Sequence, residues 1–184
     1  MATVILRPDA TISQTGWNTD PFPVAADNNP STSATQNNIN CNWTGRLTDL
    51  DSGLSGATIN SFTISAQAKA GRAGACNAVL SLIHDSDGAF AAETEAWSGS
   101  ITTQTTTART TQQDGSSALT YAYINDCSVK IDPNTQGIQL YELYITVDYT
   151  AAPTYGNIVN GVAAANIGKV NGVATADISK VNGV

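Results

Sequence analysis

The side chains best suited to acid–base or metal chemistry lie in three short stretches of this 184-residue chain. His84, the only histidine, stands in LIHDSDG next to Asp85 and Asp87. A nucleophile–histidine–carboxylate triad would need this ring between a reactive hydroxyl and an acid. The stretch instead has the pattern of a strand end, where a histidine forms hydrogen bonds at the surface. We therefore do not expect His84 to act as a catalytic base.

Carboxylates alternate before a glycine in TDLDSG and in HDSDG. Oxygens spaced in this way within one loop can bind Ca²⁺. Turn formation explains both stretches equally simply, because aspartate accepts hydrogen bonds from its own backbone and glycine adopts positive φ. We expect no other metal and no cofactor, since one histidine and three dispersed cysteines cannot form a zinc cage. The weak calcium candidates are Asp49, Asp51, Asp85 and Asp87.

Glu93 and Glu95 precede Trp97, an arrangement that could place two carboxylates beside a sugar-stacking ring. Two residues apart on one strand, however, the two acids share a face and need no substrate to explain them. The sequence also has no glycine loop that leads from a strand into a helix to bind phosphate. We therefore do not expect the chain to be an enzyme.

Trp17 and Trp43 flank a long polar segment from Asp20 to Asn40. A loop of this length usually binds a ligand or packs against a neighbour, and exposed indole rings stack on sugars. The two tryptophans are therefore candidate glycan contacts. The alternative is that they fill the core, as large aromatic residues commonly do.

Charged residues make up only 12% of the chain, and the formal net charge is −7. Nucleic-acid binding needs clustered Lys and Arg, which the eight scattered basic residues do not provide. No apolar run is long enough to predict membrane insertion, and the first residues lack the pattern of a signal peptide. We expect Cys41, Cys76 and Cys127 to be buried thiols, with one disulfide and a free thiol as the alternative.

Apolar and polar residues alternate with period two along much of the chain, which predicts strands with one face on a core. In ATINSFTISAQAKAG a slip near Asn60 and Ser61 predicts a bulge. The residues expected to face the core there are Ile59, Phe62, Ile64, Ala66 and Ala68. In GIQLYELYITVDYT one face is expected to carry Tyr141, Leu143, Ile145, Val147 and Tyr149, and the other Glu142, Thr146 and Asp148.

Further strands are predicted between clusters of turn-forming residues. They are Thr3–Leu6, Thr11–Ser13, Arg46–Leu50, Ala78–His84, Ser100–Ala108, Leu119–Ile124 and Ser128–Ile131. Short strands at this spacing, without a convincing helical stretch, predict an all-β fold in which two antiparallel sheets form a β-sandwich or jelly roll. We expect this domain to span residues 1–152.

A different pattern follows in residues 153–184, where Val-Asn-Gly-Val recurs at a spacing of eleven. Asn-Gly between β-branched residues is a strong hairpin signal, so each repeat predicts a strand, a turn and a strand. Such a unit buries too little apolar area to be stable alone. We expect this tail to join copies of the chain, as a trimer foremost, or to lie along another protein. The residues assigned to this contact are Val159, Asn160, Gly161, Val162, Ile167, Val170, Asn171, Gly172, Val173, Ile178, Val181, Asn182, Gly183 and Val184.

At VILRPDATISQTGW and at LYELYITVDYT the sequence resembles virion-associated β-sandwich proteins of tailed bacteriophages. Similar chains begin with a strand that contains Leu-Arg-Pro, followed by a Gly-Trp pair, and their last core strand is rich in aromatic residues. The tail repeat is also similar to tails of phage and environmental-virus proteins. The resemblance implies a structural virion protein, either a head decoration or a tail or fibre component, assembled with other virion proteins in the host cytoplasm. It implies no catalytic residues.

Two alternatives remain open from the sequence. The tryptophans and the long polar loop favour a carbohydrate-binding module that adsorbs to host-surface glycans. The third hypothesis is an extracellular filament subunit, in which Met1–Arg7 or the tail adds a strand to the sheet of the next subunit.

Overall fold

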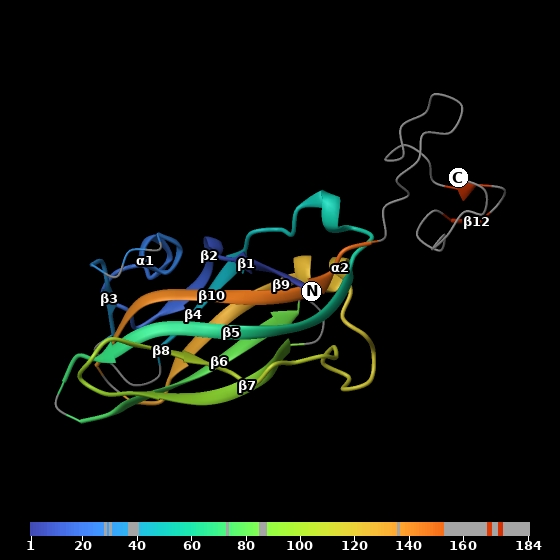
Figure 1. Cartoon of the computed structure of the whole chain (residues 1–184). Coiled ribbons are helices and arrows are strands. Elements are labelled where there is room, and N and C mark those ends of the chain that lie inside the picture. Colours follow the sequence, from blue (N-terminus) through green and yellow to red (C-terminus); the bar gives the residue numbers. More distant parts are fainter. Residues whose placement is uncertain are drawn as a thin grey trace.

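The structure is a computed structural model, and it describes residues 1–27, 29, 31–36, 41–72, 74–84, 88–135 and 137–152, with the backbone of 169–170 and 173–174. Within these residues, two five-stranded antiparallel sheets pack face to face around one hydrophobic core. The predicted all-β sandwich is confirmed (Figure 1).

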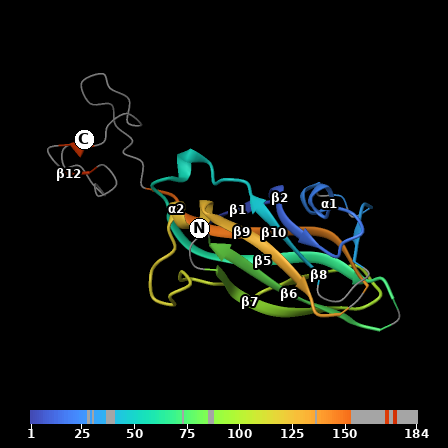
Figure 2. The ribbon, with the colours of Figure 1, turned by 180° about the vertical axis from the view of Figure 1, so that it is seen from behind.

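The first sheet, here called the β5–β10 sheet, has the strand order β1-β10-β5-β8, with β3 paired to the side of β10. Its strands are β1 (Ala2–Leu6), β3 (Ala34–Thr35), β5 (Thr58–Ala70), β8 (Thr102–Thr105) and β10 (Ile138–Thr150). The second sheet, the β6–β9 sheet, has the order β2-β4-β9-β6-β7 and is seen from its own side in Figure 2. Its strands are β2 (Pro8–Thr15), β4 (Asn42–Leu47), β6 (Cys76–His84), β7 (Gly88–Trp97) and β9 (Cys127–Pro133).

The apolar face predicted for β5 lies in the core, where every one of its residues is at most 4% exposed. The predicted bulge is also present. Ser61 pairs with Asp148 and Ile59 pairs with Tyr149, so that Asn60 is the extra residue on β5. This bulge keeps Ile59 and Phe62 on the same buried side although an even spacing would separate them.

A second bulge corrects the predicted faces of β10. Leu140 pairs with Ala68 and Glu142 with Gln67, so that Tyr141 is an extra residue. Because the bulge shifts the alternation by one position, Ile138 and Leu140 are buried with Leu143 in the core. Tyr141 was predicted to share a face with Leu143, and this prediction is wrong. Its ring instead lies beside Lys69, whose Nζ is 5.8 Å from the ring centroid.

Two helical turns and one more strand depart from the predicted pattern. Residues Leu119–Ile124 do not form a strand: Tyr121–Asn125 is helix α2, and Oγ1 of Thr120 caps it by accepting a hydrogen bond from the backbone N–H of Tyr123 at 3.1 Å. The long polar segment contains helix α1 (Phe22–Ala26) and β3. Glu93 and Glu95, which were predicted to lie on one strand, belong to β7.

All three cysteines are buried and unbridged, as the sequence favours. Cys41 Sγ donates to the carbonyl oxygen of Gly16 at 3.2 Å, and Cys127 Sγ donates to that of Tyr123 at 3.1 Å. The buried thiols thus help to hold two connections in place. In the described part of the chain, no helix has the length and apolar character needed to cross a membrane.

The middle repeat of the tail pairs as predicted. Strand β11 (Lys169–Val170) runs antiparallel to β12 (Val173–Ala174), with Val170 opposite Val173. The other tail positions assigned to self-association lie outside the described residues. At the other terminus, β1 forms an edge of its own sheet and pairs with β10 over five residues, Ala2 to Leu6. A filament that uses Met1–Arg7 would have to separate or extend that pairing.

Candidate functional site

The side of the β5–β10 sheet that faces away from the core carries mostly polar side chains, of which Ser65, Tyr141 and Glu142 are buried. Its residues alternate with core residues on paired strands, so the strand register brings together side chains that lie up to 140 positions apart in the sequence. We call this surface the outer face. It comprises Arg7 beside β1, Ser65, Gln67 and Lys69 on β5, Thr105 on β8, and Tyr141, Glu142, Tyr144, Thr146 and Asp148 on β10.

An aromatic ring lies at the middle of the outer face. Tyr144 is half-buried, and the guanidinium carbon of Arg7 is 5.0 Å from the centre of its ring. A cation at this distance from a ring is attracted by the negative ring face. The contact orients both side chains and places the planar guanidinium beside the apolar ring of Tyr144.

A second aromatic residue lies three positions earlier on the same strand. Tyr141 is 5% exposed, packs beside Lys69, and donates its hydroxyl to Oε1 of Gln139 at 3.4 Å. Glu142, 8% exposed, lies between the two tyrosines in the chain. The charges on this surface balance, because Arg7 and Lys69 match Glu142 and Asp148.

Hydroxyl groups cross the outer face beside Tyr144. Ser65 pairs with both Tyr144 and Thr105 in the strand register, and the Ser65 and Thr105 side-chain oxygens are hydrogen-bonded at 2.9 Å. Two residues further along, Thr63 pairs with Thr146. The surface around the ring thus carries short groups that both donate and accept hydrogen bonds.

Two acceptor oxygens on this surface have no hydrogen-bond donor among the described residues. They are Oε1 of Gln67 and Oδ1 of Asp148, and both atoms are buried although their residues are half-exposed. A buried oxygen without a donor is costly, typically by about 1–3 kcal/mol, and native structures contain few of them. A ligand that supplies O–H or N–H donors would reach the two oxygens only after their side chains turn toward the surface.

The predicted glycan contacts Trp17 and Trp43 do not come together on an exposed surface. Trp43 is 0% exposed and lies in the core, where its ring covers Gly45 on the same strand and its Nε1 donates to Oγ1 of Thr11 at 3.0 Å. Its assignment as a glycan contact is therefore wrong. Trp17 is half-buried and packs against the core.

Among the acidic candidates of the sequence, Asp51 serves a structural contact. Oδ1 of Asp51 accepts the backbone N–H of Gly53 at 2.7 Å, which caps a 3₁₀ turn (η1, Ser52–Leu54), while Asp49 is exposed. Asp85 and Asp87 lie outside the described residues. Across the described ranges, no three His, Cys, Asp or Glu residues form a group that could hold a metal ion.

His84 and Glu93, which were also considered for catalysis, contact other parts of the chain. The His84 ring stacks on that of Tyr123 with centroids 4.1 Å apart. Glu93 Oε2 accepts the backbone N–H of Thr107 at 2.8 Å, and its Oε1 lies 3.5 Å from Arg109. Burial, followed by the nearby charge of Glu93, raises the pKa of Glu95 above its ordinary value.

No protein-family model matches this sequence, and no curated protein is similar to it in sequence. Among solved structures, truncated AlyQ with CBM32 and alginate lyase domains is 14% identical, with 86% of this chain and 38% of that chain covered and a TM-score of 0.50. The C-terminal CBM6 of LamC, a marine laminarinase from Zobellia galactanivorans, is 9% identical over 79% of this chain and 98% of that chain, with a TM-score of 0.45.

A phage protein is also among the solved structures that match this chain. The enzymatically active domain of tailspike protein 4 of bacteriophage CBA120 is 13% identical over 80% of this chain and 19% of that chain, with a TM-score of 0.39. At such identities the likeness shows the fold alone. The likeness to AlyQ, at a TM-score of 0.50, agrees with the antiparallel β-sandwich described above.

The outer face was missed from the sequence because its residues are ordinary in isolation. The only signal was the polar side of YELYITVDYT, where Glu142, Tyr144, Thr146 and Asp148 alternate with core residues. Only tryptophans were predicted as glycan contacts, so Tyr141 and Tyr144 were not among the candidates. Arg7 and Gln67 join the surface only through strand pairing.

Proposed function

We propose that this chain is a non-enzymatic carbohydrate-binding protein whose ligand lies along the outer face. The observation that carries the proposal is the pair of buried acceptors without donors, Gln67 Oε1 and Asp148 Oδ1, on either side of the half-buried Tyr144 ring. Sugars combine an apolar ring face with many O–H donors. They therefore match a surface that offers an aromatic ring and acceptors together.

In this proposal Tyr144 receives the apolar face or edge of one sugar ring, and Arg7 donates to its hydroxyl oxygens. Gln67 and Asp148 accept sugar hydroxyls on the two sides of that ring. Because residues on one strand face are about 6.6 Å apart for every second position, the row from Asp148 to Glu142 is long enough for an extended oligosaccharide. The balanced charge of the surface favours a neutral glycan over a polyanionic one.

A glycan array with the full-length chain tests the proposal and identifies the sugar. Tyr144→Ala should lower the affinity for the best glycan by about tenfold or more, which corresponds to about 1.4 kcal/mol, while Tyr144→Phe should retain most of it. Gln67→Ala should weaken binding as well. Gln14→Ala, at an exposed glutamine on β2 in the opposite sheet, is the matched control and should bind as the wild type does.

Binding to no glycan would contradict the proposal, provided that the protein is folded by circular dichroism. So would equal losses of affinity in the Gln67→Ala and Gln14→Ala variants. Hydrolysis of any bound glycan, detected as new reducing ends, would contradict the non-enzymatic part.

We further propose that the tail holds the protein in an oligomer, a trimer foremost, on a virion or another extracellular particle. The specific observation that favours this is the short β11–β12 pair in the middle repeat, since two strands of two residues need further partners to be stable. A particle component that adsorbs to host glycans would combine both roles.

Light scattering of the full-length chain and of a chain ended at Ala152 tests the oligomer. The full-length protein should have about three times the mass of the shortened one per particle. Immunogold labelling with an antibody against residues 1–150 tests the location, where gold on heads indicates decoration and gold on tails or fibres indicates attachment. Label only on cell-surface filaments would contradict the virion location and favour the filament subunit.

A further inference from the structure

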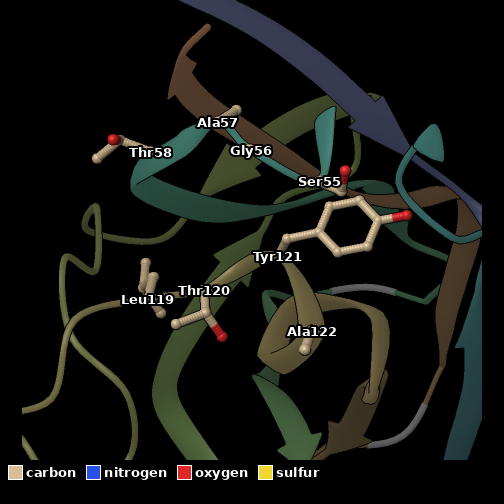
Figure 3. Close-up of a pocket in the computed structure, with 8 residues that line it drawn as sticks. All are labelled: Ser55, Gly56, Ala57, Thr58, Leu119, Thr120, Tyr121 and Ala122. Carbon is tan, nitrogen blue, oxygen red and sulfur yellow. The ribbon is translucent and has the colours of Figure 1, made fainter. Parts of the chain in front are cut away.

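A groove of about 480 Å³ lies at the end of the sandwich where β10 pairs with the start of β5. Figure 3 shows its two walls, one from the connection into β5 and one from the start of helix α2. The lining residues are Ser55, Gly56, Ala57, Thr58, Leu119, Thr120, Tyr121 and Ala122. The groove shares no residue with the outer face.

The polar groups of the groove are partly engaged within the chain. Tyr121 donates its hydroxyl to the carbonyl oxygen of Leu50 at 2.9 Å, and the Thr120 hydroxyl oxygen accepts from the helix backbone. None of the eight lining residues carries a formal charge. The other groups on the walls are methyl groups, one leucine side chain and short hydroxyls. Such walls fit an uncharged chain with small side chains.

The last described residues of the domain are attached to one wall of this groove. Thr150 pairs with Thr58, and its hydroxyl is hydrogen-bonded to Asn60 at 3.1 Å. Ala152 lies against Gly56, where an added Cβ would come within 3.3 Å of the Ala152 Cβ. The tail therefore leaves the domain at the rim of the groove.

We propose that the groove binds the repeat tail of a second copy of this chain. Residues 157–184 contain only three charged side chains, Lys169, Asp177 and Lys180, among valines, alanines, asparagines and glycines. This composition matches the uncharged, narrow walls. The inference rests on the proposed tail-mediated assembly and names the surface that receives the tail.

The geometry favours a second copy over the chain's own tail. A residue before proline prefers an extended conformation, which disfavours a tight turn at Ala152 that would return the chain's own tail to the adjacent wall. The 32 residues from 153 to 184 can span up to about 100 Å when extended, which easily reaches a neighbour. Each copy would give its tail to one neighbour and receive a tail from another, a heterologous exchange that closes a ring such as a trimer.

Filling the groove of the full-length protein provides the test. Ala122 is exposed on the groove wall, so Ala122→Trp should fold normally and block the tail. The matched control is Ala92→Trp, at an exposed alanine on β7 outside the groove. Light scattering across a dilution series should show that Ala122→Trp raises the dissociation constant about tenfold or more, whereas Ala92→Trp leaves it unchanged. A synthetic peptide of residues 157–184 should dissociate the wild-type oligomer.

The possible outcomes separate this inference from the proposed assembly. Suppose that Ala122→Trp has the wild-type mass at every dilution while the chain ended at Ala152 is a monomer. The tail then assembles the protein elsewhere, and the groove inference is overturned. Equal masses for the full-length and shortened chains would overturn both. Folding of each variant is checked by its circular dichroism spectrum and melting temperature.

Discussion

Replacing Gly45 by alanine tests the placement of Trp43 in the core. A Cβ added at Gly45 would lie 2.3 Å from Cη2, 2.8 Å from Cζ2 and 3.0 Å from Cζ3 of Trp43. Gly45 does not have a positive φ, so lack of space, and not backbone strain, opposes a side chain there. Overpacking of this kind costs about 1–3 kcal/mol. It is offset by about 0.5–1 kcal/mol, because alanine loses less backbone entropy than glycine on folding.

The same substitution should behave differently when the indole is smaller. Trp43→Phe removes the outer part of the ring that approaches Gly45, at the cost of a cavity and of the hydrogen bond to Thr11. In this background Gly45→Ala should be neutral or slightly stabilising. The double-mutant cycle should therefore give a coupling free energy of about 1–3 kcal/mol.

Urea unfolding followed by tryptophan fluorescence and circular dichroism measures the four free energies of unfolding. For a chain of this size, each kcal/mol corresponds to about 2–4 °C in melting temperature. If Gly45→Ala costs the same in both backgrounds, within about 0.5 kcal/mol, the indole does not cover Gly45. The exclusion of Trp43 from the glycan contacts would then lose its basis.

Three further predictions concern single groups. The hydroxyl of Ser117 and the backbone of the same turn lower the pKa of Asp114 to about 2 from an ordinary value of 3.8. The stabilising contribution of the Asp114 carboxylate should therefore be complete above pH 3.8 and lost as the pH falls through about 2. A carboxyl NMR titration with a midpoint near 4 would contradict this. Burial raises the pKa of the Cys76 thiol, so Ellman's reagent should label it only in denaturant, and rapid labelling of the native protein would refute its burial. Gln36→Leu should lower the free energy of unfolding by roughly 1–3 kcal/mol, because Oε1 accepts the buried backbone N–H of Gly137 at 2.9 Å; an unchanged urea midpoint would exclude this contribution.

Alternation of residue type predicted the long strands because one face of each is buried by the other sheet. On β5 the slip in the pattern even located the bulge at Asn60. The same reasoning assigned Tyr141 to the wrong face, because the bulge there lies within a stretch where both faces carry large apolar residues. Register information from the partner strand is needed to place such a residue.

Short elements were harder to predict, because local capping outweighs the apolar pattern. Leu119, Tyr121 and Tyr123 alternate as in a strand, yet the cap provided by Thr120 begins a helix in which Tyr123 and Ile124 are buried. The segment from Asp20 to Asn40 is polar enough to suggest a loop, although α1 packs against β10 within it. The apolar pattern is thus outweighed by a local cap at α2 and by packing against β10 at α1, which has no side-chain cap.

The candidate site depended on pairing between distant segments. Trp43 was a reasonable glycan candidate by residue type, but nothing in the sequence says that Gly45 leaves room for its ring inside the sandwich. Arg7 and Tyr144 are 137 positions apart in the sequence and meet only because β1 pairs with β10. The outer face could therefore be recognised only after the sheet order was known.

The most direct test of the central claim is an NMR titration of the full-length, isotope-labelled chain with the best glycan from the array. We predict that the largest chemical-shift changes fall on Ser65, Gln67, Tyr144 and Asp148, with saturation at one affinity that Tyr144→Ala weakens. Changes confined to the groove residues Ser55–Thr58 and Leu119–Ala122, or no changes at any glycan concentration, would contradict the assignment of the outer face as a carbohydrate-binding site.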